Sequence, residues 1–251
     1  LKDPIWENLF KKYKVVKTTY PISWPGPFMK LSYAMEKNNI KKTNLVIQAR
    51  INRKAAAEAR YRIYDSLRKK NLLSNTVYII DNPGHLRHLK YLLKNENIGF
   101  FYRDDIWLMV INEKERMNDN DKKTFSEMKL KLLEINKEKD LNFRDRDSYY
   151  GFGWSHNSNK LGIWSEGSVS TLLFKTDKNY ENLKLEISCQ PYITKKNDVS
   201  EFDIYVNDTF NQNIKLVKND RDQKIEILIN EKIVEKNEIK IDFKFKNPVS
   251  P

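Results

Sequence analysis

The first half of the chain alternates short apolar runs with longer runs of helical spacing. The short runs "KYKVVKTTY", "TNLVIQARI" and "NTVYIID" predict strands, and "IGFFYRDDIWLMVI" predicts two strands that reverse at Asp104 and Asp105. Helical spacing marks "PGPFMKLSYAMEKNN", "RKAAAEARYRIYDSLRKKN" and "NPGHLRHLKYLLKN", the last opened by Asn82 and Pro83. This alternation predicts a small three-layer α/β domain with a mainly parallel sheet, over residues 1–115.

In the second half the spacing of apolar residues changes to every second position. Short strands are predicted at "MKLKLLEI", "KDLNF", "STLLFKT", "NLKLEISCQPYI", "EFDIYVND", "NIKLVK", "QKIEILIN" and "NEIKIDFKF". Tight hairpins are predicted at "YVNDTF" and "LINEKI", because Asn and Asp favour turns. No helical pattern interrupts the strands, so residues 127–251 are predicted to form an all-β sandwich of jelly-roll type. The polar stretch before it predicts a linker at residues 116–126.

The charge of the chain changes at the same place as the pattern. Residues 1–126 hold 25 Lys and Arg against 13 Asp and Glu, whereas residues 127–251 hold 21 against 21. The whole net charge of +12 therefore lies in the first half, which supports two domains. A basic domain attracts an anionic partner such as a nucleic acid, a lipid headgroup or a phosphorylated sugar. Nucleic acid is the least favoured, because the basic residues are spread out and no reading motif accompanies them.

Cysteine use and hydropathy limit the class of protein. The single cysteine, Cys189, excludes an internal disulfide, and its place in "LEISCQPYI" predicts a small buried residue of a strand. No apolar run reaches the roughly 18–20 residues of a membrane span, and no signal peptide is visible. The chain begins with Leu1, and we expect that it is cut from a longer protein that holds any anchor.

Familiar catalytic motifs are missing from the sequence. It has no dinucleotide or phosphate-binding glycine loop and no nucleophile elbow. His85 and His88 stand three apart, but without a third ligand at clear spacing they predict a solvated helix face and no metal site. No cofactor is predicted, and no catalytic residue is assigned.

Ligands of open α/β sheets bind beyond the carboxyl ends of the strands. The aromatic, cationic and amide residues at these ends suit a sugar or a sugar phosphate. They are Tyr20, Trp24, Gln48, Arg50, Asn52, Arg53, Asp81 and Asn82. The alternative is that they are capping and turn residues, Asp81 and Asn82 especially.

The stretch "SYYGFGWSHNSNKLGIWSEGSVSTLLFK" holds two of the five Trp and four of the seven Gly. Glycine allows tight bends and close backbone approach, and Trp is an amphipathic plate. One interpretation is that Trp154 and Trp164 fill the core between two sheets. The other is a sugar-binding platform in which the two Trp act together with His156, Asn157 and Glu166.

Motifs in this stretch and after it resemble a known family. "GFGWSHNSNKLGIWSEGSVSTLLF", "QPYI", "IYVND" and the closing "FKNPVSP" resemble the β-sandwich appended to bacterial surface-polysaccharide glycosyltransferases. That family often has an acidic residue where this chain has Asn157–Lys160. The first half, around "LVIQARINRKAAAEARYRIYDSLRKKNLLSNTVYIID", resembles the soluble domain after the membrane helices of lipid-linked sugar transferases.

The resemblance implies an accessory function on the periplasmic side of a bacterial inner membrane. The chain would help to hold a glycan acceptor or a lipid-linked sugar phosphate, with its membrane segments and the catalytic acidic loops outside it. It would not transfer sugar in isolation. The alternative is a self-standing glycan-binding or glycan-modifying enzyme, with the α/β domain catalytic.

Overall fold

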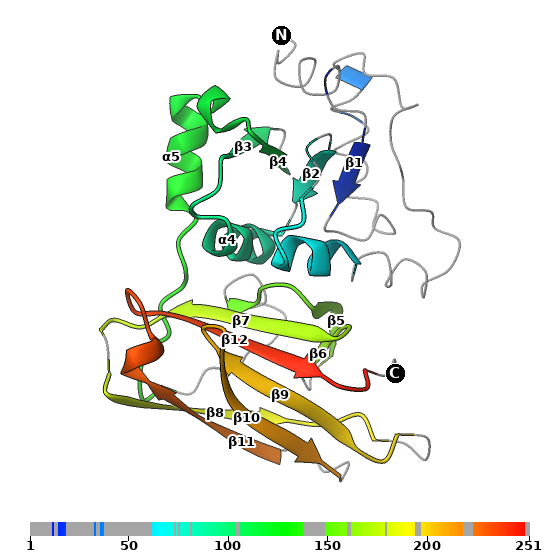
Figure 1. The fold of residues 1–251 in the computed structure, drawn as a ribbon, viewed down its shortest axis with the longest axis vertical. Coiled ribbons are helices and arrows are strands. Elements are labelled where there is room, and N and C mark those ends of the chain that lie inside the picture. The colour runs from blue at the N-terminus through cyan, green and yellow to red at the C-terminus, as the bar shows by residue number, and fades with distance from the viewer. Residues whose placement is uncertain are drawn as a thin grey trace. The chain divides into compact units, whose positions relative to one another are not determined.

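A computed structural model describes residues 12, 15–18, 33, 36–37, 62–72, 74, 76–80, 82–103, 106–137, 149–159, 162–178, 180–193, 197–217 and 223–248. The chain divides into two compact units, Leu1–Lys129 and Leu130–Pro251 (Figure 1). The described strands are paired mostly in antiparallel fashion, and the helices are few.

The first unit contains a four-stranded sheet in the order β1-β2-β4-β3. Its strands are β1 (Val15–Thr18), β2 (Thr76–Ile80), β3 (Ile98–Arg103) and β4 (Ile106–Ile111). Only β1 and β2 are parallel, while β4 is antiparallel to both β2 and β3. The mainly parallel sheet is therefore not seen in the described residues. The predicted reversal between β3 and β4 is present. Because β4 then pairs with β2 in antiparallel fashion, the sheet is mixed. The predicted strand "TNLVIQARI" lies outside the described residues.

The predicted helix at "NPGHLRHLKYLLKN" is confirmed as α4 (Pro83–Leu92). Asn82 caps it, since its Oδ1 accepts hydrogen bonds from the backbone N–H groups of Gly84 at 2.7 Å and His85 at 3.1 Å. The prediction of a solvated histidine face is wrong, because His85 and His88 are both buried. Leucines on the same helix are buried beside them, so nearly the whole circumference of the helix is covered.

The predicted linker at residues 116–126 is in fact part of the first unit. It contains the end of η2 (Lys114–Arg116) and most of α5 (Asp119–Glu127). A capping box between Asn118 and Asp121 starts α5, which explains the run of polar residues there.

Two contacts fix α5 in place. The buried Asp121 accepts hydrogen bonds from Arg103 of β3 at 2.5 and 3.1 Å. At the other end of the helix, Lys90 donates to the carbonyl of Phe125 at 2.7 Å, where the helix leaves carbonyls without an internal partner. Two of the polar residues that suggested a linker, Asn118 and Asp121, therefore start α5, and Asp121 also pairs with β3.

The second unit contains an antiparallel four-stranded sheet in the order β10-β9-β12-β7 and two pairs of strands. The sheet is formed by β7 (Val169–Lys175), β9 (Ser200–Val206), β10 (Thr209–Leu216) and β12 (Glu238–Phe245). The pairs are β8 (Asn182–Cys189) with β11 (Gln223–Asn230), and β5 (Trp154–Asn159) with β6 (Gly162–Ser165). In Figure 1, β12 lies between β7 and β9.

One hydrophobic core joins the four-stranded sheet to the β8–β11 pair. Every second residue of β9, β11 and β12 is buried in it, as for Ile204, Ile227 and Ile241. Leu185 and Ile187 of β8 pack against the same core. This arrangement is sandwich-like, as the period-two pattern predicted.

Side chains of β10 also reach the other layer. The Asn211 amide donates to the Leu228 carbonyl at 2.7 Å, and the Gln212 amide donates to the Glu226 carbonyl at 2.6 Å. A register shift between Phe210 and Gln212 allows both neighbouring side chains to reach β11.

The two predicted hairpins have different outcomes. "YVNDTF" is confirmed as the turn between β9 and β10, with Asn207 and Asp208 at φ of 45° and 69°. "LINEKI" is not a hairpin, because β11 pairs with β8 while β12 pairs with β7 and β9. Its residues form η4 (Glu231–Ile233), which crosses from one layer to the other. The predicted strand "MKLKLLEI" is reduced to a single bridge between Leu132 and Lys175.

Candidate functional site

The glycine-rich and tryptophan-rich stretch lines the edge of the four-stranded sheet. Tyr150 pairs with Leu172 of β7 in antiparallel fashion. The Gly151 N–H donates to the Thr171 carbonyl at 2.9 Å, and the Thr171 N–H donates to the Phe152 carbonyl at 3.0 Å. The segment therefore gives hydrogen-bond partners to an edge strand that would otherwise expose them.

Gly153 makes the turn that follows. Its φ of 91° lies in the region that favours glycine, and an added Cβ would lie 2.0 Å from the Val169 carbonyl oxygen. The Gly153 carbonyl accepts hydrogen bonds from the Ser170 hydroxyl at 2.5 Å and from the Glu166 N–H at 2.6 Å. Glycine at this position therefore allows two segments of backbone to approach closely.

Trp154 belongs to the core. It packs against the buried cluster of the second unit, with ring centroids 4.9 Å from Tyr150 and 6.1 Å from Phe243. Its indole Nε1–H donates to the Thr171 carbonyl at 2.7 Å. With its polar group satisfied inside the protein and its rings packed, Trp154 fits the core interpretation better than the sugar platform.

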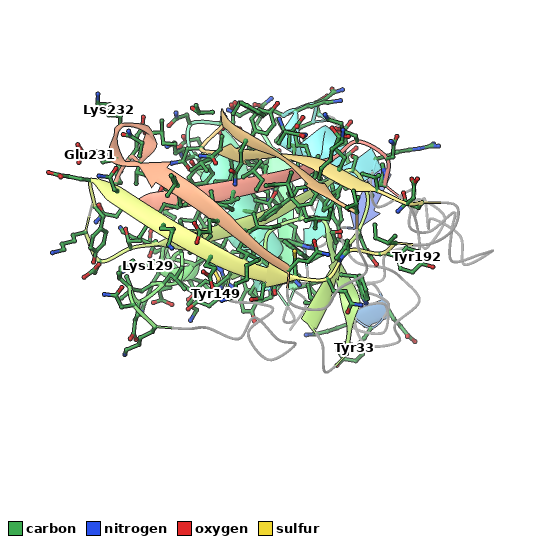
Figure 2. The ribbon with its side chains drawn as sticks, turned by 90° about the horizontal axis from the view of Figure 1, so that it is seen from below. Tyr33, Lys129, Tyr149, Tyr192, Glu231 and Lys232 are labelled. Carbon is green, nitrogen blue, oxygen red and sulfur yellow. The ribbon has the colours of Figure 1, made fainter. Side chains whose placement is uncertain are left out.

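Trp164 lies in different surroundings. It is half-buried on β6, and its ring stands edge-on to Tyr192 at 6.4 Å. Tyr192 follows β8 and is 37% exposed. Figure 2 shows Tyr192 at the opposite end of the second unit from Glu231 and Lys232. The half-buried Glu166 follows Trp164 by two residues in the sequence, just after β6 ends. We call Trp164, Glu166 and Tyr192 the aromatic end.

Tyr192 was not among the predicted site residues. The only indication in the sequence was "QPYI", where Pro191 ends the strand and leaves an aromatic residue in the following loop. The Asn197 side chain donates to the Tyr192 carbonyl at 2.9 Å and so holds this loop. Because the partner ring comes from a distant segment, the pairing of Trp164 with Tyr192 could not be found from spacing alone.

Most of the remaining predicted site residues lie outside the described residues. Of the α/β cleft prediction, this holds for all residues except Asn82, namely Tyr20, Trp24, Gln48, Arg50, Asn52, Arg53 and Asp81. His156 is placed on β5 by its backbone only. Asn82 is described, and it is the cap of α4, as the alternative interpretation had it.

The described residues offer little redox or metal chemistry. Burial raises the pKa of the Cys189 thiol to about 11, so the thiolate that reacts or binds metal is scarce at neutral pH. Within the described part of the chain, no group of three or more His, Cys, Asp or Glu is placed to hold a metal ion.

Comparisons with protein families, curated proteins and solved structures gave no match to this chain. None of the helices in the described ranges is both long and apolar enough to cross a membrane.

Proposed function

We propose that this chain is a glycan-binding accessory region of a bacterial membrane glycosyltransferase. In this proposal it acts on the extracytoplasmic side and helps to hold a glycan acceptor or a lipid-linked sugar phosphate. Its membrane segments and its catalytic acidic loops belong to other parts of the enzyme. The second unit is the binding module, and its sandwich is of jelly-roll type.

The observation that carries the proposal is the aromatic end. Trp and Tyr rings at a surface offer a flat apolar plate with a polar edge, which suits the CH faces and hydroxyls of a sugar ring. Trp164 and Tyr192 form such a pair, and Glu166 provides an acceptor oxygen close to them in sequence. The sequence motifs that resemble the glycosyltransferase-linked sandwich include both tryptophans and the segment "QPYI".

The test is a titration of the 251-residue chain with neutral oligosaccharides and with polyprenyl-phosphate sugars, in which tryptophan fluorescence reports binding. We expect weak binding that Trp164→Ala abolishes, because a shallow surface site depends on a few aromatic contacts. Tyr192→Phe is the matched control, since it removes the hydroxyl and keeps the ring.

An activity assay with the same sugars and a glycan acceptor separates the alternatives. Turnover by the chain alone would show a self-standing enzyme and contradict the accessory function. If Trp164→Ala binds every tested sugar as the unaltered chain does, the aromatic end is not the site.

A further inference from the structure

The four-stranded sheet of the second unit has a polar and aromatic outer face. The side chains of Phe202, Ile204 and Val206 on β9 are buried in the core. Asp203 and Tyr205 between them, and Glu201 before them, therefore belong to the other face. The strand register places Phe210, Asn213 and Lys215 of β10 opposite the outward residues of β9. Lys244 of β12 lies on the same face, opposite Asp203. We call this surface of β9, β10 and β12 the outer aromatic face.

Phe210 is the most accessible ring of this face. It is 55% exposed, and its ring stands edge-on to Tyr205 at 5.7 Å. The ammonium of Lys244 lies 3.5 Å from the centre of the Tyr205 ring, so it occupies one side of that ring. Phe210 is therefore the ring left for stacking, and Tyr205 holds it from the edge. A single exposed aromatic residue is common on protein surfaces and does not by itself indicate a binding site. The polar groups around Phe210 are therefore the deciding feature.

Those polar groups hold one another in position. The Asn213 amide donates to Asp203 at 2.7 Å and to Glu201 at 3.3 Å. The Lys246 ammonium donates to Glu201 at 2.5 Å and lies 3.8 Å from Asp203. Donors and acceptors fixed in this way lose little freedom when a ligand binds. The Lys246 hydrogen bond also holds the pKa of Glu201 below its ordinary value, so the acceptor stays ionised at neutral pH.

The charges of this face nearly cancel. Three carboxylates, those of Glu201, Asp203 and Asp242, stand among four ammonium groups, those of Lys215, Lys240, Lys244 and Lys246. Nucleic acids and anionic membranes select surfaces with a clear excess of positive charge. A neutral sugar instead needs a flat ring for its CH face and a mixture of donors and acceptors for its hydroxyls.

We infer that the outer aromatic face binds a neutral oligosaccharide, with Phe210 stacking on a sugar ring and Asp203 and Asn213 hydrogen-bonding to its hydroxyls. The inference rests on the proposed glycan-binding function and adds a second site to the aromatic end. The two sites are formed by different strands of the second unit.

The experiment is a nuclear magnetic resonance titration of the ¹⁵N-labelled chain with chitotriose, cellotriose and maltotriose at millimolar concentration. With at least one of them we expect shifts of the backbone amides of Tyr205, Phe210 and Asn213. Phe210→Ala should weaken this binding about tenfold, which corresponds to about 1.4 kcal/mol. Leu228→Ala is the matched control, because Leu228 is also an exposed apolar residue, at 67%, and lies on another strand. Asp203→Ala should weaken binding without removing the ring.

The outcomes separate this inference from the proposed function. Shifts confined to Trp164 and Tyr192 would overturn the inference and leave the proposed function standing. Shifts at Phe210 that Trp164→Ala does not remove support the inference, even if the aromatic end fails. If none of the three sugars causes a shift, the inference is overturned. If the chain also fails to bind lipid-linked sugars, both the inference and the proposed function are overturned. Tighter, salt-sensitive binding of a heparin oligosaccharide at this face would overturn the assignment of a neutral ligand.

Discussion

The two Trp-Ser pairs of the second unit have the same sequence, and both tryptophans are half-buried, but their rings pack against different neighbours. Trp154 of β5 is packed against Tyr150 and Phe243 with its indole N–H satisfied, whereas Trp164 of β6 contacts the exposed Tyr192. The register explains this difference, because Trp154 is paired with Ser165. Directly opposed residues share a face and neighbours along a strand alternate, so Trp164 takes the other face of the β5–β6 pair. Strand register, and not local sequence, decides which tryptophan is structural.

The strongest test of this comparison is Trp154→Ala. We expect it to lower the free energy of unfolding by roughly 3–5 kcal/mol, because it truncates a packed aromatic residue and leaves a cavity. It also leaves the Thr171 carbonyl with one donor fewer. Urea unfolding followed by circular dichroism measures the effect, with Trp164→Ala as the matched variant. If the two variants lose the same free energy of unfolding, the conclusion that only Trp154 supports the core is wrong.

Gly153→Ala tests the turn that directs Trp154 inward. A residue other than glycine at a φ of 91° costs about 1–3 kcal/mol, and the contact of the new Cβ with the Val169 carbonyl adds to this. The same urea unfolding measures the loss. Ser170→Ala is the control, because it removes a hydrogen bond to the Gly153 carbonyl and keeps the glycine. Its expected loss is about 1 kcal/mol. A Gly153→Ala protein as stable as the original would contradict the close backbone approach.

Trp164→Ala should change stability by no more than about 1 kcal/mol, since the Trp164 ring contacts the exposed Tyr192 and, among the described residues, is not one of those that pack against the buried cluster of the second unit. Cys189 provides a second readout, because it packs against the core and burial raises its pKa to about 11. We expect slow labelling of Cys189 by thiol reagents at neutral pH in the original chain and in Trp164→Ala, and faster labelling in Trp154→Ala. Fast labelling in Trp164→Ala would show that this tryptophan also closes the core.

The sequence predicted local features well where short-range chemistry decides them. Asn82 and Pro83 start a helix, Asn207 and Asp208 make a turn, and the alternating β11 faces the core with every second residue. The predictions from the sequence were wrong or incomplete where a residue far away in the chain determines the structure. The polar residues 116–126 were interpreted as a linker because their partners Arg103 and Lys90, which hold α5 in place, are distant in the sequence. The pairing of β4 with β2 and that of Trp164 with Tyr192 are likewise set by tertiary contacts.

The smallest expected effect comes from the charged outer face of the β8–β11 pair, which contributes no ring to either tryptophan site. There, Lys224 donates to Glu186 at 2.7 Å, and this hydrogen bond lowers the pKa of Glu186. A carboxyl whose pKa is lowered by folding stabilises the protein above its unfolded pKa, and this stabilisation is lost as the pH falls through the folded value. We therefore expect Lys224→Met to reduce stability slightly at neutral pH and not at a pH below the folded pKa of Glu186. Both residues are solvent-exposed, so added salt should shrink the difference further. Thermal melting at neutral and at acid pH, each at low and high salt, measures it. A loss as large at acid pH as at neutral pH would show that Lys224 acts through packing of its alkyl chain and not through its charge.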